Sequence, residues 1–136
     1  GVREMEMIIT EKNYVEKAEN VILKLKEKKD KKNRVIPMVT TSKLRNLLSM
    51  TSDIYNEILN FQEEELSEEI CGRIDYLKVR FLYEAGREEK VRDLVEEAKI
   101  IDCINEIKGN RKRYILFSRY MEALVAYHRY YGGRDN

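Results

Sequence analysis

Apolar side chains recur along this chain every three to four residues, which is the spacing of one face of an α-helix. In one such stretch the stripe consists of Ile70, Ile74, Leu77, Phe81 and Leu82. Proline would interrupt helices, and Pro37 is the only proline in 136 residues. We find no internal repeat and no convincing strand pattern. The sequence therefore predicts an all-α fold.

Five helical segments are predicted, each bounded by capping residues or glycine. Threonine and serine at 40–42 and Ser67 are of the type that caps a helix N-terminus, while Gly86, Gly109 and Gly132 are placed to end helices. The expected segments run from after Thr10 to about Lys28, from Thr40 to Leu59, from Ser67 to Gly86, from Val91 to Ile104, and from Asn110 to Gly132.

Length and short connections predict a compact single-domain bundle of about five helices covering 1–136. Residues 1–7 are expected to lie outside the fold, as a disordered leader or as residues foreign to the natural protein, with Met5 or Met7 as its native start. Residues 26–37 are expected to form a mobile basic loop, since KEKKDKKNR has almost no apolar side chain. The predicted core contains Leu44, Leu47, Leu48, Leu77, Phe81, Leu94, Tyr120 and Leu124.

Charge and cysteine content limit which kind of binding site and which cellular compartment we expect. The net charge is +1 although 38% of residues are charged, so a nucleic-acid site would have to come from local arrangement. Cys71 and Cys103 are too few for a disulfide framework. Without a signal peptide or an apolar run near 18 residues, a cytoplasmic protein with reduced thiols is expected.

The sequence offers little for catalysis. His128 is the only imidazole, and we interpret it as a packed or partly exposed side chain rather than a base. No His or Cys lies at metal-ligand spacing, and neither GxxxxGK[ST] nor GxGxxG occurs. We expect no enzyme, no metal and no cofactor.

The helix start at TTSKLR carries the wrong charge for its position. Lys43 and Arg45 lie in a first turn, where the helix dipole favours acidic residues, and neither has an acid three or four residues later. Free amide groups, hydroxyls and two cations together would suit a phosphate group. We therefore predict anion binding at Lys43 and Arg45.

Further cations are candidates with weaker support. Lys78, Arg80 and Arg119 lie in two other helical segments, and Arg87 comes just past the glycine that ends one of them. Arg80 has an ordinary local partner in Glu84. A single surface cation is more often solvated or paired than functional. The lysine loop is the least specific of these signals.

Three strings carry a family resemblance when they occur together in this order. They are TTSKLRNLLSMTSDIYNEI, RIDYLKVRFLYEAGRE and FSRYMEALVAYHRYYGG. With them the chain resembles the small subunit of type III-A CRISPR (Csm) effector complexes from Ile8 to Gly133, although the KKDKKNR loop matches poorly.

The resemblance implies a helical, non-catalytic protein that packs in several copies along CRISPR RNA paired with target RNA. Its partners would be the two RNAs, other Csm subunits and further copies of itself. By this resemblance the RNA backbone would be contacted by Lys43, Arg45, Lys78, Arg80, Arg87 and Arg119. The alternative is a protein-only adaptor that docks another helical protein through Tyr127, Tyr130 and Tyr131. A small helical enzyme is the third and weakest interpretation.

Overall fold

A computed structural model describes residues 7–134 of the chain. The predicted leader therefore lies outside the described residues except for Met7. Within the described range there are six helices and, besides them, only isolated β-bridges. The helices are α1 (Tyr14–Glu27), α2 (Thr41–Ile58), α3 (Glu68–Arg87), α4 (Glu89–Glu97), α5 (Ile100–Asn105) and α6 (Arg111–Tyr130).

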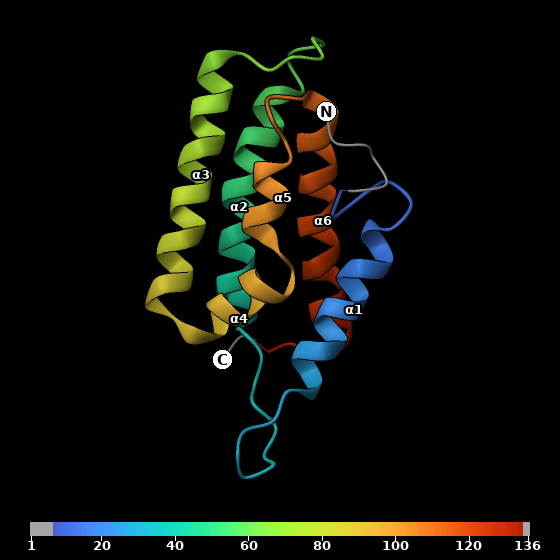
Figure 1. Ribbon diagram of the computed structural model, residues 1–136, viewed down its shortest axis with the longest axis vertical. Helices are drawn as coiled ribbons and strands as arrows, with labels where there is room; N and C mark the ends of the chain where they lie inside the picture. Colours follow the sequence, from blue (N-terminus) through green and yellow to red (C-terminus); the bar gives the residue numbers. More distant parts are fainter. Residues whose placement is uncertain (1–6, 135–136) are drawn as a thin grey trace.

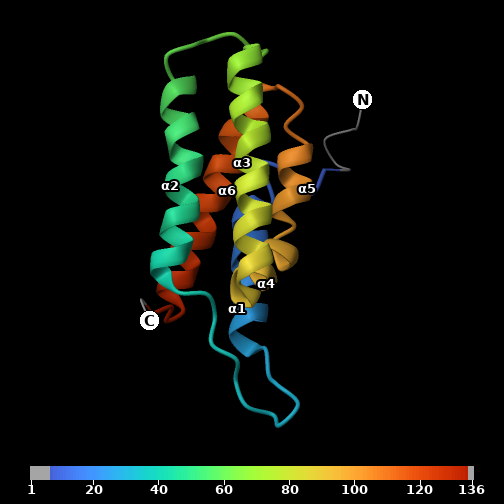
Figure 2. The same ribbon diagram turned by 90° about the vertical axis from the view of Figure 1, so that its left-hand side faces the viewer.

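The helices form one bundle in which α6 is central (Figure 1). Helix α6 packs against both α1 and α2, and α3 packs against α2, α4 and α5. The turned view shows α3 on the outer side of the bundle, between α2 and α5 (Figure 2). The all-α prediction is confirmed, and no helix within residues 7–134 has the length and apolar character needed to cross a membrane.

Three predicted helix starts are confirmed by their caps. The side chains of Thr40, Ser67 and Asn110 accept hydrogen bonds from backbone amides three residues later, at 3.3, 3.2 and 3.0 Å. Each cap pairs an N–H group that has no partner inside the helix. Gly109 and Gly132 have positive φ at the predicted boundaries, a conformation that glycine adopts without steric cost.

The predicted single helix from Val91 to Ile104 is wrong, because the chain breaks at Lys99. Lys99 has a positive φ of 54°, and this left-handed backbone conformation separates α4 from α5. Because the residue is not a glycine, the sequence gives no sign of the break. The Ala98 carbonyl accepts a hydrogen bond from the Tyr120 hydroxyl at 2.9 Å. A tertiary contact thus satisfies a backbone group at the break, which explains why local sequence did not predict it.

Gly86 does not end its helix as predicted, since α3 continues to Arg87. Gly86 itself lies within the helix. The guanidinium of Arg92 donates to the carbonyls of Ala85 and Gly86 at 3.2 and 3.3 Å. The end of α3 is therefore stabilised by a side chain from α4.

The basic loop lies between α1 and α2 and extends beyond one end of the bundle (Figure 1). Asp30 organises its tip by accepting from the backbone amides of Lys32 and Arg34 at 2.8 and 2.9 Å. The Arg34 amide is the main cause that lowers the pKa of Asp30. The loop has a defined turn, and its mobility stays a prediction.

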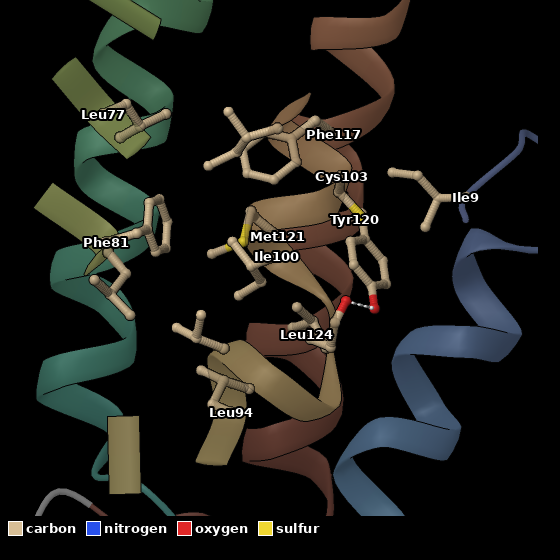
Figure 3. Close-up of a cluster of buried hydrophobic side chains, with 14 of the residues drawn as sticks. Ile9, Leu77, Phe81, Leu94, Ile100, Cys103, Phe117, Tyr120, Met121 and Leu124 are labelled. Carbon is tan, nitrogen blue, oxygen red and sulfur yellow. Dashed lines mark hydrogen bonds between the residues drawn. The ribbon is translucent and has the colours of Figure 1, made fainter. Parts of the chain in front are cut away.

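The core gathers side chains from all six helices. Figure 3 shows the part of it that α3, α4, α5 and α6 contribute. Phe81 and Phe117 meet edge to face with ring centroids 6.5 Å apart. The buried residues include seven of the eight predicted core positions: Leu44, Leu47, Leu77, Phe81, Leu94, Tyr120 and Leu124.

Leu48 was predicted in the core but is only half-buried. It lies at the edge of the stripe formed by Leu44, Leu47 and Thr51. Two other stripe residues, Leu59 and Leu82, are exposed because one follows the end of α2 and the other lies on the outer side of α3. Periodicity alone did not distinguish residues at the centre of an apolar stripe, which are buried, from residues at its edge, which are partly exposed.

The end of α6 closes the bundle against the start of α2. His128 is fully buried and its Nε2 donates to the Val39 carbonyl at 2.7 Å, while the Arg134 carbonyl accepts from the Thr41 amide at 2.7 Å. Gly133 passes directly over the His128 ring, and a Cβ at position 133 would overlap it.

Neighbouring leucines of α2 provide a test of the core. Leu47→Ala should lower the free energy of unfolding by about 2–5 kcal/mol, because Leu47 is fully buried. Leu48→Ala should cost clearly less, since Leu48 is only partly buried at the edge of the core. Urea denaturation of both variants measures the difference, and equal losses would contradict the described burial.

Two glycines should respond in opposite directions to alanine. Gly133→Ala should destabilise the fold by about 1–3 kcal/mol, because its new methyl group collides with the His128 ring. Gly86→Ala should stabilise it by about 0.5–1 kcal/mol, because Gly86 lies inside a helix and nothing is within 4 Å of an added Cβ. Thermal unfolding of the two variants checks the sign of each effect.

Candidate nucleic-acid interface

Lys43 and Arg45 are exposed in the first turns of α2. The amides around them are already used, because the Thr41 amide donates to Arg134 and the Lys43 amide donates to Thr40. The expectation of free amide groups is therefore wrong at these two positions. An anion bound here would find only part of the helix N-terminus free and would depend mainly on side chains.

Lys43 has an acidic partner that sequence spacing could not show. Its ammonium group forms an ion pair with Glu88, which lies at the C-terminal end of α3, 45 residues further along the chain. Helices α2 and α3 bring the two together because they run in opposite directions (Figure 2). Arg45 makes no ion pair with any residue in the range 7–134.

Arg80 and Arg87 share one carboxylate on α3. The predicted Arg80–Glu84 pair is confirmed at 3.3 Å, and Arg87 approaches the same Glu84 oxygen at 3.9 Å. Both guanidinium groups also lie over the Tyr83 ring, 5.3 and 5.7 Å from its centroid. These two arginines are thus partly neutralised and held in place.

Lys78 and Arg80 lie on opposite sides of α3. Arg80 borders a groove of about 450 Å³ between α2 and α3, together with Met50 and Tyr76. Lys78 borders a crevice of about 160 Å³ toward α5, together with Lys108. Two residues turn a helix by about 200°, so these cations cannot face one ligand surface together.

Arg119 is exposed on α6 and, among the described residues, forms no ion pair. The arginines at the start of this helix instead form hydrogen bonds to backbone carbonyls within the chain. Arg111 donates to the Phe61 carbonyl at 3.0 Å, and Arg113 donates to the Glu106 carbonyl at 3.2 Å. The six predicted cations therefore lie on three helices and do not converge on one point.

The tyrosines of the alternative interpretation mostly hold α6 to α1. The Tyr131 hydroxyl donates to Glu19 at 2.5 Å, and this bond is the main cause that raises the pKa of Tyr131 to about 12. Tyr127 stacks on Tyr131 with ring centroids 6.1 Å apart. Of the three, Tyr130 is the most exposed, at 78%, although its ring also meets the Tyr131 ring edge to face with centroids 5.1 Å apart. Two of the three proposed docking residues are thus engaged within the chain.

The single imidazole and one of the two thiols are buried, whereas Cys71 is partly exposed. His128 is buried, and burial is the main cause that lowers its pKa. Burial also raises the pKa of the Cys103 thiol to about 12. Within residues 7–134 no group of three or more His, Cys, Asp or Glu side chains is placed to hold a metal ion.

Comparison with known proteins decides the family. The model of the family "Csm2 Type III-A" matches residues 10–134. The chain belongs to the Csm2 family of type III-A. The resemblance to the small subunit of type III-A CRISPR complexes is thereby confirmed.

Three curated relatives support the same assignment. Each is named "CRISPR system Cms protein Csm2". The Streptococcus thermophilus protein is 45% identical over 128 residues, covering 94% of this chain and 98% of the relative. The Enterococcus italicus protein is 37% identical over 121 residues, covering 84% and 86%. The Mycobacterium tuberculosis protein is 36% identical over 129 residues, covering 95% and 99%.

The buried His128 should make this Csm2 chain sensitive to mild acid. Its lowered folded pKa means that the unfolded chain takes up the proton first as pH falls below about 6.5, so folding stability is lost in that direction. The slope from this residue is at most about 1.4 kcal/mol per pH unit.

Urea denaturation of the wild type and His128→Gln at pH 7.5 and 5.5 measures this contribution. The variant should be less stable at pH 7.5 but should lose less stability on acidification. Carboxylates contribute to the acid-dependent loss of stability in both proteins alike. An equal loss of stability in the two proteins would therefore contradict the role given to His128.

Proposed function

We propose that this Csm2 chain is a non-catalytic RNA-binding subunit of a cytoplasmic type III-A CRISPR ribonucleoprotein. Several copies, together with other Csm subunits, would lie along CRISPR RNA paired with target RNA and contact its backbone. The observation that carries the proposal is family membership over residues 10–134. Arg45 on α2 and Arg119 on α6 are exposed and form no ion pair within residues 7–134, and they supply the positive charge that a phosphate contact needs.

Backbone contacts suit a subunit that must accept any guide sequence. Phosphate contacts carry no base information, whereas hydrogen bonds to base edges do. Arg45 and Arg119 are exposed, and no carboxylate in residues 7–134 neutralises them. They are the strongest candidates for phosphate contacts among the six predicted residues.

Lys43, Arg80 and Arg87 could reach phosphate only by giving up carboxylate partners. Exposed ion pairs of this kind contribute about 0–1 kcal/mol, so exchanging Glu84 or Glu88 for a phosphate costs little. These three residues therefore stay in the proposal as contacts that form when RNA displaces the acid.

Neutralising Arg45 and Arg119 should weaken RNA binding without changing sequence preference. In the assembled complex, Arg45→Gln with Arg119→Gln should flatten the plot of log affinity against log salt by about 1.4–1.8, or 0.7–0.9 for each lost phosphate contact. Binding should fall similarly for unrelated RNA sequences. Filter binding or anisotropy over a range of salt concentrations measures both quantities.

A matched control removes the same charge elsewhere. Lys12→Gln with Lys99→Gln changes two exposed cations outside the proposed surface and should leave the salt slope unchanged. If both double variants flatten the slope equally, only net charge matters and the assignment of Arg45 and Arg119 is lost. A loss confined to one RNA sequence would indicate base contacts instead.

The purified chain should not cleave RNA or DNA or hydrolyse nucleotides, with or without divalent metal. The reason is that its imidazole and its Cys103 thiol are buried away from any substrate. Product analysis by denaturing gels measures cleavage. Turnover that disappears in His128→Gln while the variant stays folded would overturn the non-catalytic assignment.

A further inference from the structure

A groove of about 450 Å³ lies between α2 and α3, which stand side by side in Figure 2. Its apolar lining consists of Met50, Ile54 and Leu77. Gly72 leaves bare helix backbone in one wall, and nothing in the described chain lies within 4 Å of a Cβ added there. The groove therefore has room for a side chain that the described chain does not supply.

The groove lies in the acidic part of the chain. Residues 46–72 contain no lysine or arginine but seven acidic residues, although the whole chain has 26 lysines and arginines against 25 acids. Two of the seven, Asp53 and Glu69, line the groove and are exposed. Neither of them forms an ion pair with a residue in the range 7–134.

The two arginines of the groove do not balance this charge. Arg73 forms an ion pair with Glu57, and Arg80 pairs with Glu84 at 3.3 Å. Each guanidinium group is thus already matched by one carboxylate, and the two exposed carboxylates of the groove are left over. The groove has a net negative charge, so a complementary ligand is a cation.

Tyr76 indicates which kind of cation fits. Its side chain is 63% exposed and borders the groove. A guanidinium group is planar, stacks on an aromatic ring and donates hydrogen bonds to carboxylates, so it suits a tyrosine beside two acids. The methylene stem of an arginine would at the same time cover the apolar lining.

We propose that this groove docks a basic segment of another protein, which inserts an arginine side chain between α2 and α3. The guanidinium group lies on the Tyr76 ring and donates to Asp53 and Glu69. Bare backbone at Gly72 lets the inserted side chain approach α3 closely. This docking site is additional to the proposed RNA contacts and does not depend on them.

RNA fits the groove poorly, because its phosphates would meet unpaired carboxylates. The charge of α2 changes sign along its length. Lys43 and Arg45 lie in its first turns, whereas Asp53 and Glu57 lie in its last turns. The cations proposed to contact RNA are therefore at the opposite end of α2 from the acids of the groove.

Chemical-shift mapping of the isotope-labelled full chain without RNA tests the proposal. The probe is the peptide acetyl-Leu-Arg-Leu-amide, and its neutral counterpart carries citrulline, which has the shape of arginine without the charge. The arginine peptide should shift the backbone amides of Gly72 and Tyr76. It should bind about tenfold more tightly than the citrulline peptide, because hydrogen bonds between charged groups are the stronger ones.

Gly72→Leu should weaken binding of the arginine peptide by about tenfold or more, since the new side chain occupies the groove. Gly86→Leu is the matched control, because Gly86 lies in the same helix, is equally open and is outside the groove. Asp53→Asn removes one carboxylate and should also weaken the peptide by about tenfold. Circular dichroism should show an unchanged fold in all three variants, since each position is exposed.

Equal affinity for the two peptides, binding that survives Gly72→Leu, or no shift at the groove overturns the proposal. Shifts of the same amides by an oligouridylate would place RNA in the groove and overturn it as well. A third contrary result would come from sedimentation velocity, if Gly72→Leu but not Gly86→Leu removed self-association, because the occupant would then be a second copy. Since the peptide measurement contains no RNA, its failure leaves the proposed RNA contacts untouched.

Discussion

The bundle depends on hydrogen bonds that α6 makes to backbone carbonyls of other segments. The Tyr114 hydroxyl donates to Thr51 in α2 at 2.6 Å, Tyr120 donates to Ala98 after α4, and His128 donates to Val39 before α2. A buried polar group is costly unless it is paired, so these bonds define one position of α6 against its neighbours. Apolar packing alone would tolerate sliding of the helix.

This arrangement also determines what the surface of α2 can offer. The end of α6 holds the residues before α2, and the Arg134 carbonyl and Thr40 hydroxyl occupy amides of its first turn. Two of the first-turn amides are therefore paired without a ligand. The first turns of α2 expose charged side chains to solvent. Of these, Lys43 is paired with Glu88, whereas Arg45 forms no ion pair within residues 7–134.

Helix α3 combines three surfaces with different chemistry. One flank borders the groove toward α2 with Arg80, the other borders the crevice toward α5 with Lys78, and the outer face carries tyrosines and Val79. Residues that are close in sequence thus serve different surfaces, because each step along a helix turns it by about 100°.

The sequence by itself determined the all-α class, three helix starts and most core positions, because caps and apolar spacing are local properties. Three strings of residues in the sequence also indicated the family, and the family model confirms it. The break at Lys99, the edge position of Leu48 and the pairing of Lys43 with Glu88 were decided only by the tertiary structure. Each depends on groups far apart along the chain, and these meet only when the helices have packed.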